Sequence, residues 1–269
     1  MEGTGANLML KMFSIEYDYV THPLPPGWIE PFATGDLALA EPGYRYKDDG
    51  SGDSIARLHS AFSEFVAHYW VWKNLPKTEY IGFCHYRRFF NFMKIPQINL
   101  AQLNTPATPE ILQFVNQQEQ KDRALEILQT WDGIAPKQIS MPISIHEQYC
   151  DNHPPYIWDE FIRVIKHVSP PWLSKYVPLF ELSREFQIVP IFILRWEIFE
   201  EYCALLFDVL FLVFKNIGPL AEVEGARFQP RRYSAFLAER FLMLYFHAKG
   251  LRLFGTQIIM LDGALRPRA

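Results

Sequence analysis

Residues 58–86 carry the pattern that most restricts how this chain can fold, a helix followed at once by a buried strand. Apolar side chains recur there at spacings of three and four, which predicts a helix of about five turns with one apolar stripe: Leu58, Phe62, Phe65, Tyr69 and Trp72. Pro76 ends this helix, and the apolar run EYIGFCHY at 79–86 follows as a buried central strand. An earlier alternating segment, FSIEYDYVT at 13–21, predicts another strand, so the order strand, helix, strand indicates an α/β layered fold.

The rest of the chain continues this alternation of strands and helices. Further strands are expected at WDGIA (131–135), QIVPIFIL (187–194) and LRLFGTQIIML (251–261), and helices at 156–168, 196–214 and 233–250. Pro190 would place its strand at an edge or at a bulge. The Gln-, Asn- and Pro-rich stretch at about 94–125 is expected to be a peripheral insertion. No linker divides the chain, so we expect a single domain over residues 1–269.

Composition and charge exclude several classes of protein. The formal net charge of -4 gives no basic field that would attract nucleic acid. The three cysteines are widely spaced, so neither a disulfide framework nor a four-ligand zinc site is indicated. The amino terminus lacks a secretory pattern, and the most apolar stretch, near 202–214, contains Asp208 and is too short to span a bilayer. These features predict a cytoplasmic protein.

A histidine and two arginines stand at the end of the predicted central strand. In CHYRRFF, strand alternation puts His85 and Arg87 on one side and Tyr86 and Arg88 on the other, so at least one cation should reach a ligand there. Guanidinium and imidazole groups can stabilise an anionic leaving group such as a diphosphate through charge-assisted hydrogen bonds. The two arginines could equally be surface charges that flank a strand.

Several segments together resemble one bacterial family, which carries the description of a domain of unknown function. Its members occur in capsular, exopolysaccharide and O-antigen synthesis proteins and are thought to be glycosyltransferases. FSEFVAHYWVWKN at 62–74 followed by YIGFCHYRRFF at 80–90 resembles the opening signature. The other matches span nearly the whole chain and keep the family's order: DDGSGDSI (48–55), WDGIAPK (131–137), EQYCDNH (147–153), EIFEEYCALLFDVLF (197–211) and RYSAFLAERFL (232–242).

This resemblance implies a fold and a reaction. The fold would be a GT-A-like α/β/α sandwich for a nucleoside diphosphate sugar, with a mixed central sheet and helical additions. The reaction would move a hexose, in pyranose or furanose form, to a glycan or lipid-linked glycan in surface or extracellular polysaccharide synthesis. A lipid-linked acceptor of this kind implies that the transfer reaction takes place at the inner face of the cell membrane. Related enzymes often hold a metal at an Asp-x-Asp motif, which this chain lacks, so we predict transfer without a metal cofactor.

Five residues are candidates for donor binding. His85, Arg87 and Arg88 would hold the diphosphate. Asp53, in the turn-forming loop YKDDGSGDS, could accept hydrogen bonds from the ribose or base, although turn and cap chemistry explains it as well. Lys73 could add a positive charge near the diphosphate, although a cation in the last turn of a helix also has a structural reason to be there.

Two carboxylates compete for the role of general base. Arg232 and Glu239 are seven residues apart in a predicted helix and so share one face, and Glu239 could take the acceptor's proton if its surroundings tune its pKa. Asp132, at a strand end, is the competitor, and a structural ion pair of Glu239 with an arginine is the other interpretation. Glu64 matches a family glutamate but is also explained by a solvated helix face shared with His68.

The EQYCDNH segment follows a proline-bounded turn and matches a family segment expected near the acceptor or the donor. Gln148, Tyr149 and His153, together with Arg232, are therefore candidates for contacts with the acceptor or the sugar. A lone histidine is more often structural, which is the alternative for His153.

Two departures from the family pattern leave other functions open. Pro190-Ile191-Phe192 stands where Asn-Met-Phe is usual, and Ala235 stands where glycine is usual, although a small alanine could still let a ligand approach. These changes leave two alternatives open. The protein could act on an altered substrate, or it could bind a nucleotide sugar or carbohydrate without catalysis. A glycoside hydrolase would need two carboxylates about 5 to 10 Å apart around one bond, and no local pair suggests one.

Overall fold

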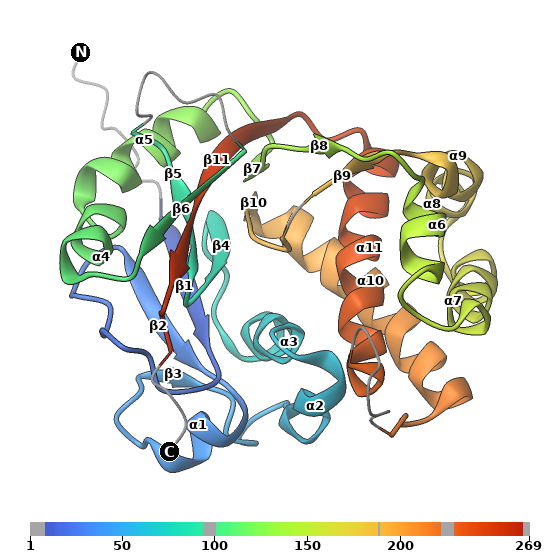
Figure 1. Cartoon of the computed structure of the whole chain (residues 1–269), viewed down its shortest axis with the longest axis horizontal. Helices are drawn as coiled ribbons and strands as arrows, with labels where there is room; N and C mark the ends of the chain where they lie inside the picture. The colour runs from blue at the N-terminus through green and yellow to red at the C-terminus, as the bar shows by residue number, and fades with distance from the viewer. Residues whose placement is uncertain (1–8, 94–100, 188, 222–228, 266–269) are drawn as a thin grey trace.

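The computed structural model describes residues 9–93, 101–187, 189–221 and 229–265, and a mixed sheet runs through them (Figure 1). Nine strands of the described chain belong to it, in the order β10-β7-β11-β5-β4-β1-β2-β3, with β6 paired to β11 and β10 also paired to β4. They are β1 (Leu10–Glu16), β2 (Ile29–Ala33), β3 (Tyr46–Lys47), β4 (Tyr80–His85), β5 (Arg88–Asn91), β6 (Gln102–Pro106), β7 (Gly133–Pro136), β10 (Phe192–Arg195) and β11 (Leu253–Asp262). Two short strands, β8 (Ile139–Ser140) and β9 (Glu185–Phe186), pair separately.

The strand directions gather several carboxyl ends at one edge of the sheet. β1 is parallel to β2 and β4, and β2 is parallel to β3. β10 runs antiparallel between β4 and β7, so β4 and β7 point the same way. The edge at which β1, β2 and β4 end is therefore a place where residues from distant parts of the chain meet.

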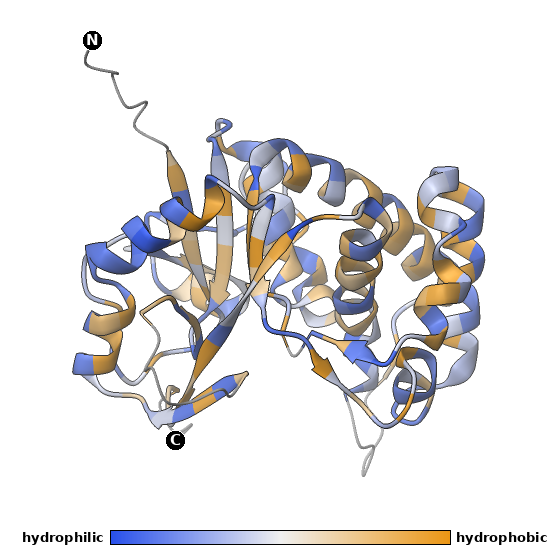
Figure 2. Ribbon diagram, turned by 90° about the horizontal axis from the view of Figure 1, so that it is seen from above, coloured by the Kyte–Doolittle hydropathy of each residue, from blue (hydrophilic) through white to orange (hydrophobic). Residues whose placement is uncertain are grey.

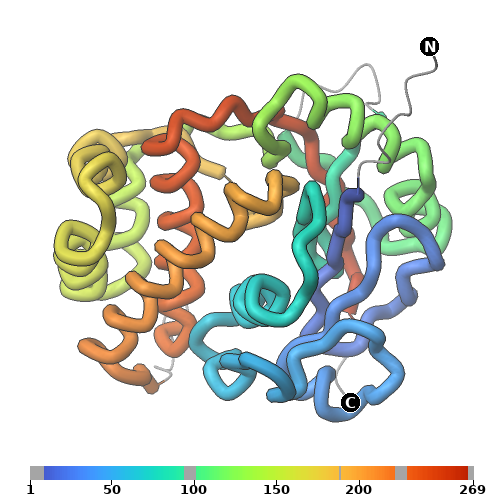
Figure 3. Tube along the Cα trace, turned by 180° about the vertical axis from the view of Figure 1, so that it is seen from behind, coloured from blue at the N-terminus to red at the C-terminus, as the bar shows by residue number. Residues whose placement is uncertain are grey.

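Helices cover both faces of this sheet, which confirms the expected α/β layering. In Figures 1 and 3, α3, α10 and α11 lie on one side and α4 and α5 on the other. The helices are α1 (Gly35–Ala40), α2 (His59–Phe62), α3 (Phe65–Asn74), α4 (Pro109–Val115), α5 (Gln118–Leu128), α6 (Ile145–Cys150), α7 (Pro155–Val168), α8 (Pro171–Ser174), α9 (Val177–Leu182), α10 (Trp196–Ile217) and α11 (Tyr233–Lys249). Single turns of 3-10 helix precede α2 (η1, Ala56–Leu58) and α11 (η2, Pro230–Arg232).

Strand alternation divides the core into two parts. Phe13 and Phe83 face α3, α10 and α11, whereas Met12 and Cys84, their neighbours in sequence, face the layer of α4 and α5. Figure 2 shows the result, with mostly hydrophobic strands in the centre and polar residues on the outer helix surfaces. Since Leu112 of α4 belongs to the second core, the described part of the 94–125 segment packs on the sheet as well as extending its edge.

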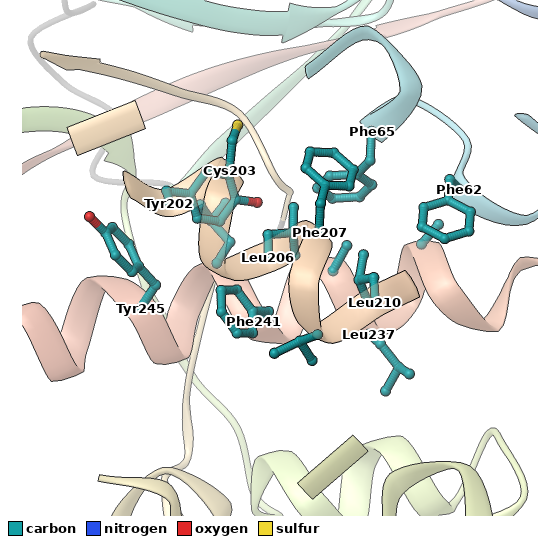
Figure 4. Close-up of a cluster of buried hydrophobic side chains, with 14 of the residues drawn as sticks. Phe62, Phe65, Tyr202, Cys203, Leu206, Phe207, Leu210, Leu237, Phe241 and Tyr245 are labelled. Carbon is teal, nitrogen blue, oxygen red and sulfur yellow. The ribbon is translucent and has the colours of Figure 1, made fainter. Parts of the chain in front are cut away.

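The first core is built mainly where α10 and α11 cross beneath α2 and α3. Figure 4 shows Leu206, Phe207 and Leu210 of α10 packed with Leu237 and Phe241 of α11 and with the rings of the α2 and α3 segment. Both long helices end at glycines with positive φ, Gly218 (79°) and Gly250 (66°), where residues with a Cβ would be strained. Within the described residues, no helix combines the length and the apolar character needed to cross a membrane.

The five-turn helix expected from Leu58 onward is wrong, because the chain breaks at Ser63. Ser63 has a φ of 48° and a ψ of -130°, which ends α2, and α3 starts afresh at Phe65. His68, expected on a polar face, is fully buried against Phe83. The apolar spacing continued through the break because both short helices pack on the same side of the sheet.

Two strand expectations also need correction. The central strand does not continue through Arg88: it ends at His85, and Tyr86 and Arg87 form a turn into β5. Pro190 precedes the strand that it was expected to interrupt, because β10 begins at Phe192 and lies inside the sheet between β4 and β7.

Candidate functional site

A cavity of about 600 Å³ opens at the carboxyl ends of β1, β2 and β4. Ile15 and Tyr17 line it at the end of β1, Thr34 just after β2, and His85 at the end of β4. The rest of the lining comes from the junction of α2 and α3 and from the residues before α11: His59, Ser60, Ser63, Glu64, Gln229, Arg231 and Arg232. Ligands of α/β sheets bind in crevices at such strand ends, so this cavity is the candidate site.

Aromatic rings gather around Tyr17 at the cavity. Its ring, 37% exposed, lies 6.4 Å from the rings of both His59 and His85 and meets Tyr86 edge-on at 5.5 Å, all between centroids. Burial lowers the pKa of His85 well below its usual value, and the nearby arginines lower it further. Burial also lowers the pKa of His59. Both imidazoles are therefore neutral near pH 7, and these rings form an uncharged surface suited to a flat ligand group.

The turn after β4 places Arg88 beside His85. The two residues are directly opposite in the β4–β5 hairpin, so their side chains lie on the same face of the sheet. The expected alternation, which put them on opposite faces, is therefore wrong. Arg87, in the turn, has its guanidinium 5.8 Å from the Tyr86 ring centroid.

Arg88 has no counter-ion bound to it in the described chain. Its Nε is buried and makes no hydrogen bond, and among the described residues its guanidinium makes no ion pair. Burial lowers the pKa of Arg88, Arg87 lowers it further, and Glu64 and Glu239 oppose the change. The two carboxylates are therefore near enough to act on Arg88 without contacting it.

The junction of α2 and α3 brings a serine and a carboxylate to the cavity. Ser63 Oγ accepts a hydrogen bond of 2.7 Å from Arg232 Nε. The next residue, Glu64, has a side chain only 10% exposed, and its Oε2 lies 3.8 Å from Arg232 Nη2. Arg232 thus joins the end of η2 to the start of α3.

Glu239, in the middle of α11, is held by its neighbour. Arg240 Nη1 donates to Glu239 Oε2 at 2.8 Å, and Arg240 Nη2 donates to Gln148 Oε1 of α6 at 2.6 Å. The Arg240 guanidinium also lies 5.7 Å from the Tyr149 ring centroid. Gln148 and Tyr149, expected to contact a substrate, therefore contact the arginine that orients Glu239.

His153 packs into the same group of side chains. Its ring stacks on Tyr149 at 4.4 Å and lies 4.7 Å from Phe236, which in turn lies under the Arg232 guanidinium at 5.6 Å. Burial lowers the pKa of His153 to about 4, and Arg240 adds to the effect. His153 is thus a neutral packing residue between α6 and α11.

Electrostatic interactions link Glu239 to the carboxylate and the arginines near the cavity. Burial raises the pKa of Glu239, and the charge of Glu64 raises it too, while Arg240, Arg88 and Arg232 lower it. The side chain keeps 25% of its surface exposed, so solvent and substrate can still reach it. The arrangement can bind an anion between guanidinium groups and offer a carboxylate with raised pKa as a proton acceptor.

Asp53 and Lys73 lie away from this site. Asp53 is exposed, accepts a hydrogen bond from Tyr69 at 2.9 Å and donates through its backbone to Asn74. Lys73 lies 3.5 Å above the Trp72 ring. Because α3 runs back along the sheet, its carboxyl end is at the amino end of β4, the edge opposite the cavity. Both residues have structural roles there.

Asp132 is also at the opposite edge, where β7 begins. It pairs with Arg252 at 3.2 Å, and hydrogen bonds from that residue hold its pKa below the usual value, which suits a structural ion pair rather than a base. Ala235 is 2% exposed and packs in the core, and neither it nor Pro190 lines the cavity. The two departures from the family pattern therefore lie outside the residues that line the cavity.

Several cavity residues carry no clear functional signal in the sequence. Tyr17 falls within the strand expected at 13–21, and His59 and Ser63 within the single expected helix, although the first strand ends at Glu16 and the helix is broken. For Glu64 the available signal was its match to a family glutamate. In the described part of the chain, no group of three or more His, Cys, Asp or Glu side chains is placed to hold a metal ion.

Comparison with known families identifies the family of the chain. Residues 28–250 match the family described as a domain of unknown function, DUF4422. The chain belongs to this family. The matched range contains Arg88 and Glu239 and every residue that lines the cavity except Ile15 and Tyr17.

A solved structure shares the fold of this DUF4422 chain. The WbbM bifunctional glycosyltransferase, in its apo form, superposes with a TM-score of 0.78 at 23% identity over 97% of the present chain. The match covers 47% of WbbM, so the chain spans about half the length of that protein. No curated protein matches the chain.

Proposed function

We propose that the protein is a glycosyltransferase that moves a hexose from a nucleoside diphosphate sugar to a glycan or lipid-linked glycan in polysaccharide synthesis, at the inner face of the cell membrane. The Arg88 guanidinium carries the proposal, because it is part-buried beside the cavity and has no bound counter-ion in the described chain. A buried charge without a partner is costly, so a ligand anion is the expected partner. A diphosphate fits, since it gains negative charge as its bond to the sugar breaks.

The cavity suggests how such a donor would lie. The nucleobase would stack on Tyr17, because aromatic rings bind base faces without adding charge. The diphosphate would lie between Arg88 and Arg232, and the sugar would then face Glu64 and Glu239. Fold likeness to WbbM supports this class of substrate only as an analogy.

Glu239 is the proposed general base. Transfer breaks the bond between the anomeric carbon and a diphosphate oxygen, which leaves with the electron pair. A bond from the acceptor hydroxyl oxygen forms, and the hydroxyl proton passes to Glu239. Its raised pKa makes it a stronger base than an exposed glutamate. The carboxylate of Glu64 in the cavity wall would stabilise the positive charge that develops on the sugar.

Arg88 and Arg232 would supply the charge for which related enzymes use a metal ion, so we propose metal-independent transfer. A melting-temperature screen with nucleoside diphosphates and their sugars tests binding, because a ligand of the native state raises the melting temperature. We expect one nucleotide to stabilise the protein in EDTA. Stabilisation that appears only with manganese would refute the metal-free mechanism, and no stabilisation in either condition would refute donor binding.

Turnover distinguishes an enzyme from a protein that only binds its ligand. Hydrolysis or transfer of the stabilising donor should be lost in Glu239→Gln, while donor binding should persist because the substitution removes the base and keeps the shape. Asp132→Asn serves as the matched control and should retain activity, since Asp132 lies at the opposite edge of the sheet. Binding without turnover in the wild-type protein would support a binding function.

A further inference from the structure

Ser63 has a backbone conformation that serine rarely adopts. Among the described residues other than glycine, it alone has a positive φ, 48° with a ψ of -130°. A Cβ is strained in this region, and glycine would adopt the same conformation at lower cost. Such strain persists where the surrounding structure enforces it, and it is common at functional sites.

The strained turn gives the cavity two adjacent side chains. The Ser63 backbone N–H donates to the His59 carbonyl at 2.8 Å, which closes α2 before α3 begins. Neighbouring residues on a straight helix point about 100° apart, so only one of them usually faces a given site. Here both Ser63 and Glu64 line the cavity.

The Ser63 hydroxyl contacts Nε of Arg232, the nitrogen that joins the guanidinium group to the rest of the side chain. Arg232 Nε donates to Ser63 Oγ at 2.7 Å, and Arg232 Nη1 donates to Gln229 Oε1 at 3.3 Å. The guanidinium plane lies over Phe236. Of the five N–H donors of an arginine, these hydrogen bonds use two, so three on the terminal nitrogens have no hydrogen-bond acceptor in the described chain.

We propose that Ser63 is a positioning residue that locks Arg232 as a clamp for the diphosphate of the donor. The hydroxyl holds Nε, and three N–H groups of the terminal nitrogens remain for phosphate oxygens in the cavity, with Nη2 3.8 Å from Glu64 Oε2. Serine is kept at a strained position because glycine, which would relax the backbone, has no side chain to accept this hydrogen bond. The choice of ligand rests on the proposed function, while the clamp itself rests on the geometry.

Two substitutions of Ser63 separate the effect of the backbone strain from the effect of the hydroxyl group. Ser63→Gly removes both, whereas Ser63→Ala removes the hydroxyl and keeps a Cβ in the strained conformation. Ser140→Ala is the control, since Ser140 is an exposed serine of β8 that does not line the cavity and makes no side-chain hydrogen bond within the described residues. Arg232→Lys keeps the charge and removes the planar group that Ser63 orients.

Titration calorimetry with inorganic pyrophosphate in EDTA, paired with melting temperatures without ligand, tests the proposal. Ser63→Gly should melt no lower than wild type and yet bind pyrophosphate about tenfold more weakly, as expected for one lost charge-assisted hydrogen bond. Ser63→Ala should lose similar affinity and melt below Ser63→Gly. Arg232→Lys should weaken binding at least as much, and Ser140→Ala should match wild type. In a transfer assay, the donor KM should rise more than kcat falls.

Three results would overturn the clamp. The first is pyrophosphate affinity within twofold of wild type in both Ser63 variants. The second is a loss of pyrophosphate affinity in Ser63→Ala but not in Ser63→Gly, which the lower melting temperature of Ser63→Ala would then explain. The third is that the wild-type protein does not bind pyrophosphate. If the Ser63 variants lose pyrophosphate affinity as expected but the wild-type protein turns over no nucleotide sugar, the positioning role of Ser63 is supported and the proposed transferase reaction is refuted.

Discussion

Replacement of Arg88 by methionine separates a ligand-binding arginine from a structural one. The side chain keeps its approximate length and loses its charge. If Arg88 binds the diphosphate, the substitution removes about two charge-assisted hydrogen bonds, each worth about 1.5–3 kcal/mol. The lower values sum to about 3 kcal/mol, so donor affinity should fall roughly a hundredfold.

The same substitution should leave the free protein as stable as before. Arg88 makes no ion pair within the described chain, so its loss breaks no bound pair, and the unfolding free energy should stay within about 1 kcal/mol of wild type or rise. A buried structural ion pair would instead cost about 3–5 kcal/mol when broken, which lowers the melting temperature of a chain of this size by several degrees.

Thermal denaturation and calorimetric titration with the stabilising nucleotide measure both quantities. Arg252→Met is the matched control: Arg252 pairs with Asp132 at the far edge of the sheet, so this change should leave nucleotide binding intact. A large loss of stability in Arg88→Met with unchanged nucleotide affinity would refute the role proposed for Arg88.

Three further predictions follow from buried titratable groups. His68 is fully buried, and neither ring nitrogen has a hydrogen-bond partner in the described chain. His68→Leu should therefore raise the unfolding free energy, measured by chemical denaturation, by roughly 1 kcal/mol. A lower unfolding free energy in this variant would contradict the absence of a partner. Burial raises the pKa of Glu16 to about 7, so the native state holds its proton more tightly and stability should fall as pH rises from about 4.5 to 7, by up to about 3 kcal/mol. Glu16→Gln should abolish this fall, and an unchanged pH profile would contradict the assignment. Because the pKa of Glu239 is also raised, the transfer rate should increase with pH as Glu239 loses its proton, with a midpoint above that of an exposed glutamate. A pH–rate profile without this limb would exclude Glu239 as the base.

Local pattern was enough to predict much of the architecture. The two long helices α10 and α11 showed continuous helical periodicity, and α11 ends at Gly250 as expected for a left-handed cap. The central strand β4 was evident from its unbroken apolar run. These features depend on neighbouring residues alone, which is why sequence was sufficient.

The site depends on features that local pattern does not contain. Nothing in the apolar spacing marks the break at Ser63, and the turn at 86–87 has no glycine, proline or asparagine to signal it. The sequence makes Asp53 and Lys73 candidates for donor binding, yet the direction of α3 places them at the far edge of the sheet. The spacing of seven residues predicts Arg232 and Glu239 on one helical face, whereas Arg232 ends the 3-10 turn η2 and Glu239 lies in α11.

The central claim is that the cavity at the carboxyl ends of β1, β2 and β4 binds the nucleoside diphosphate of a sugar donor. A crystal structure of the protein with its most stabilising nucleoside diphosphate, grown in EDTA, tests this most directly. The account predicts phosphate oxygens within hydrogen-bonding distance of Arg88 and Arg232, with the base against Tyr17. A nucleotide bound elsewhere, or a cavity that stays empty at saturating nucleotide, would contradict it.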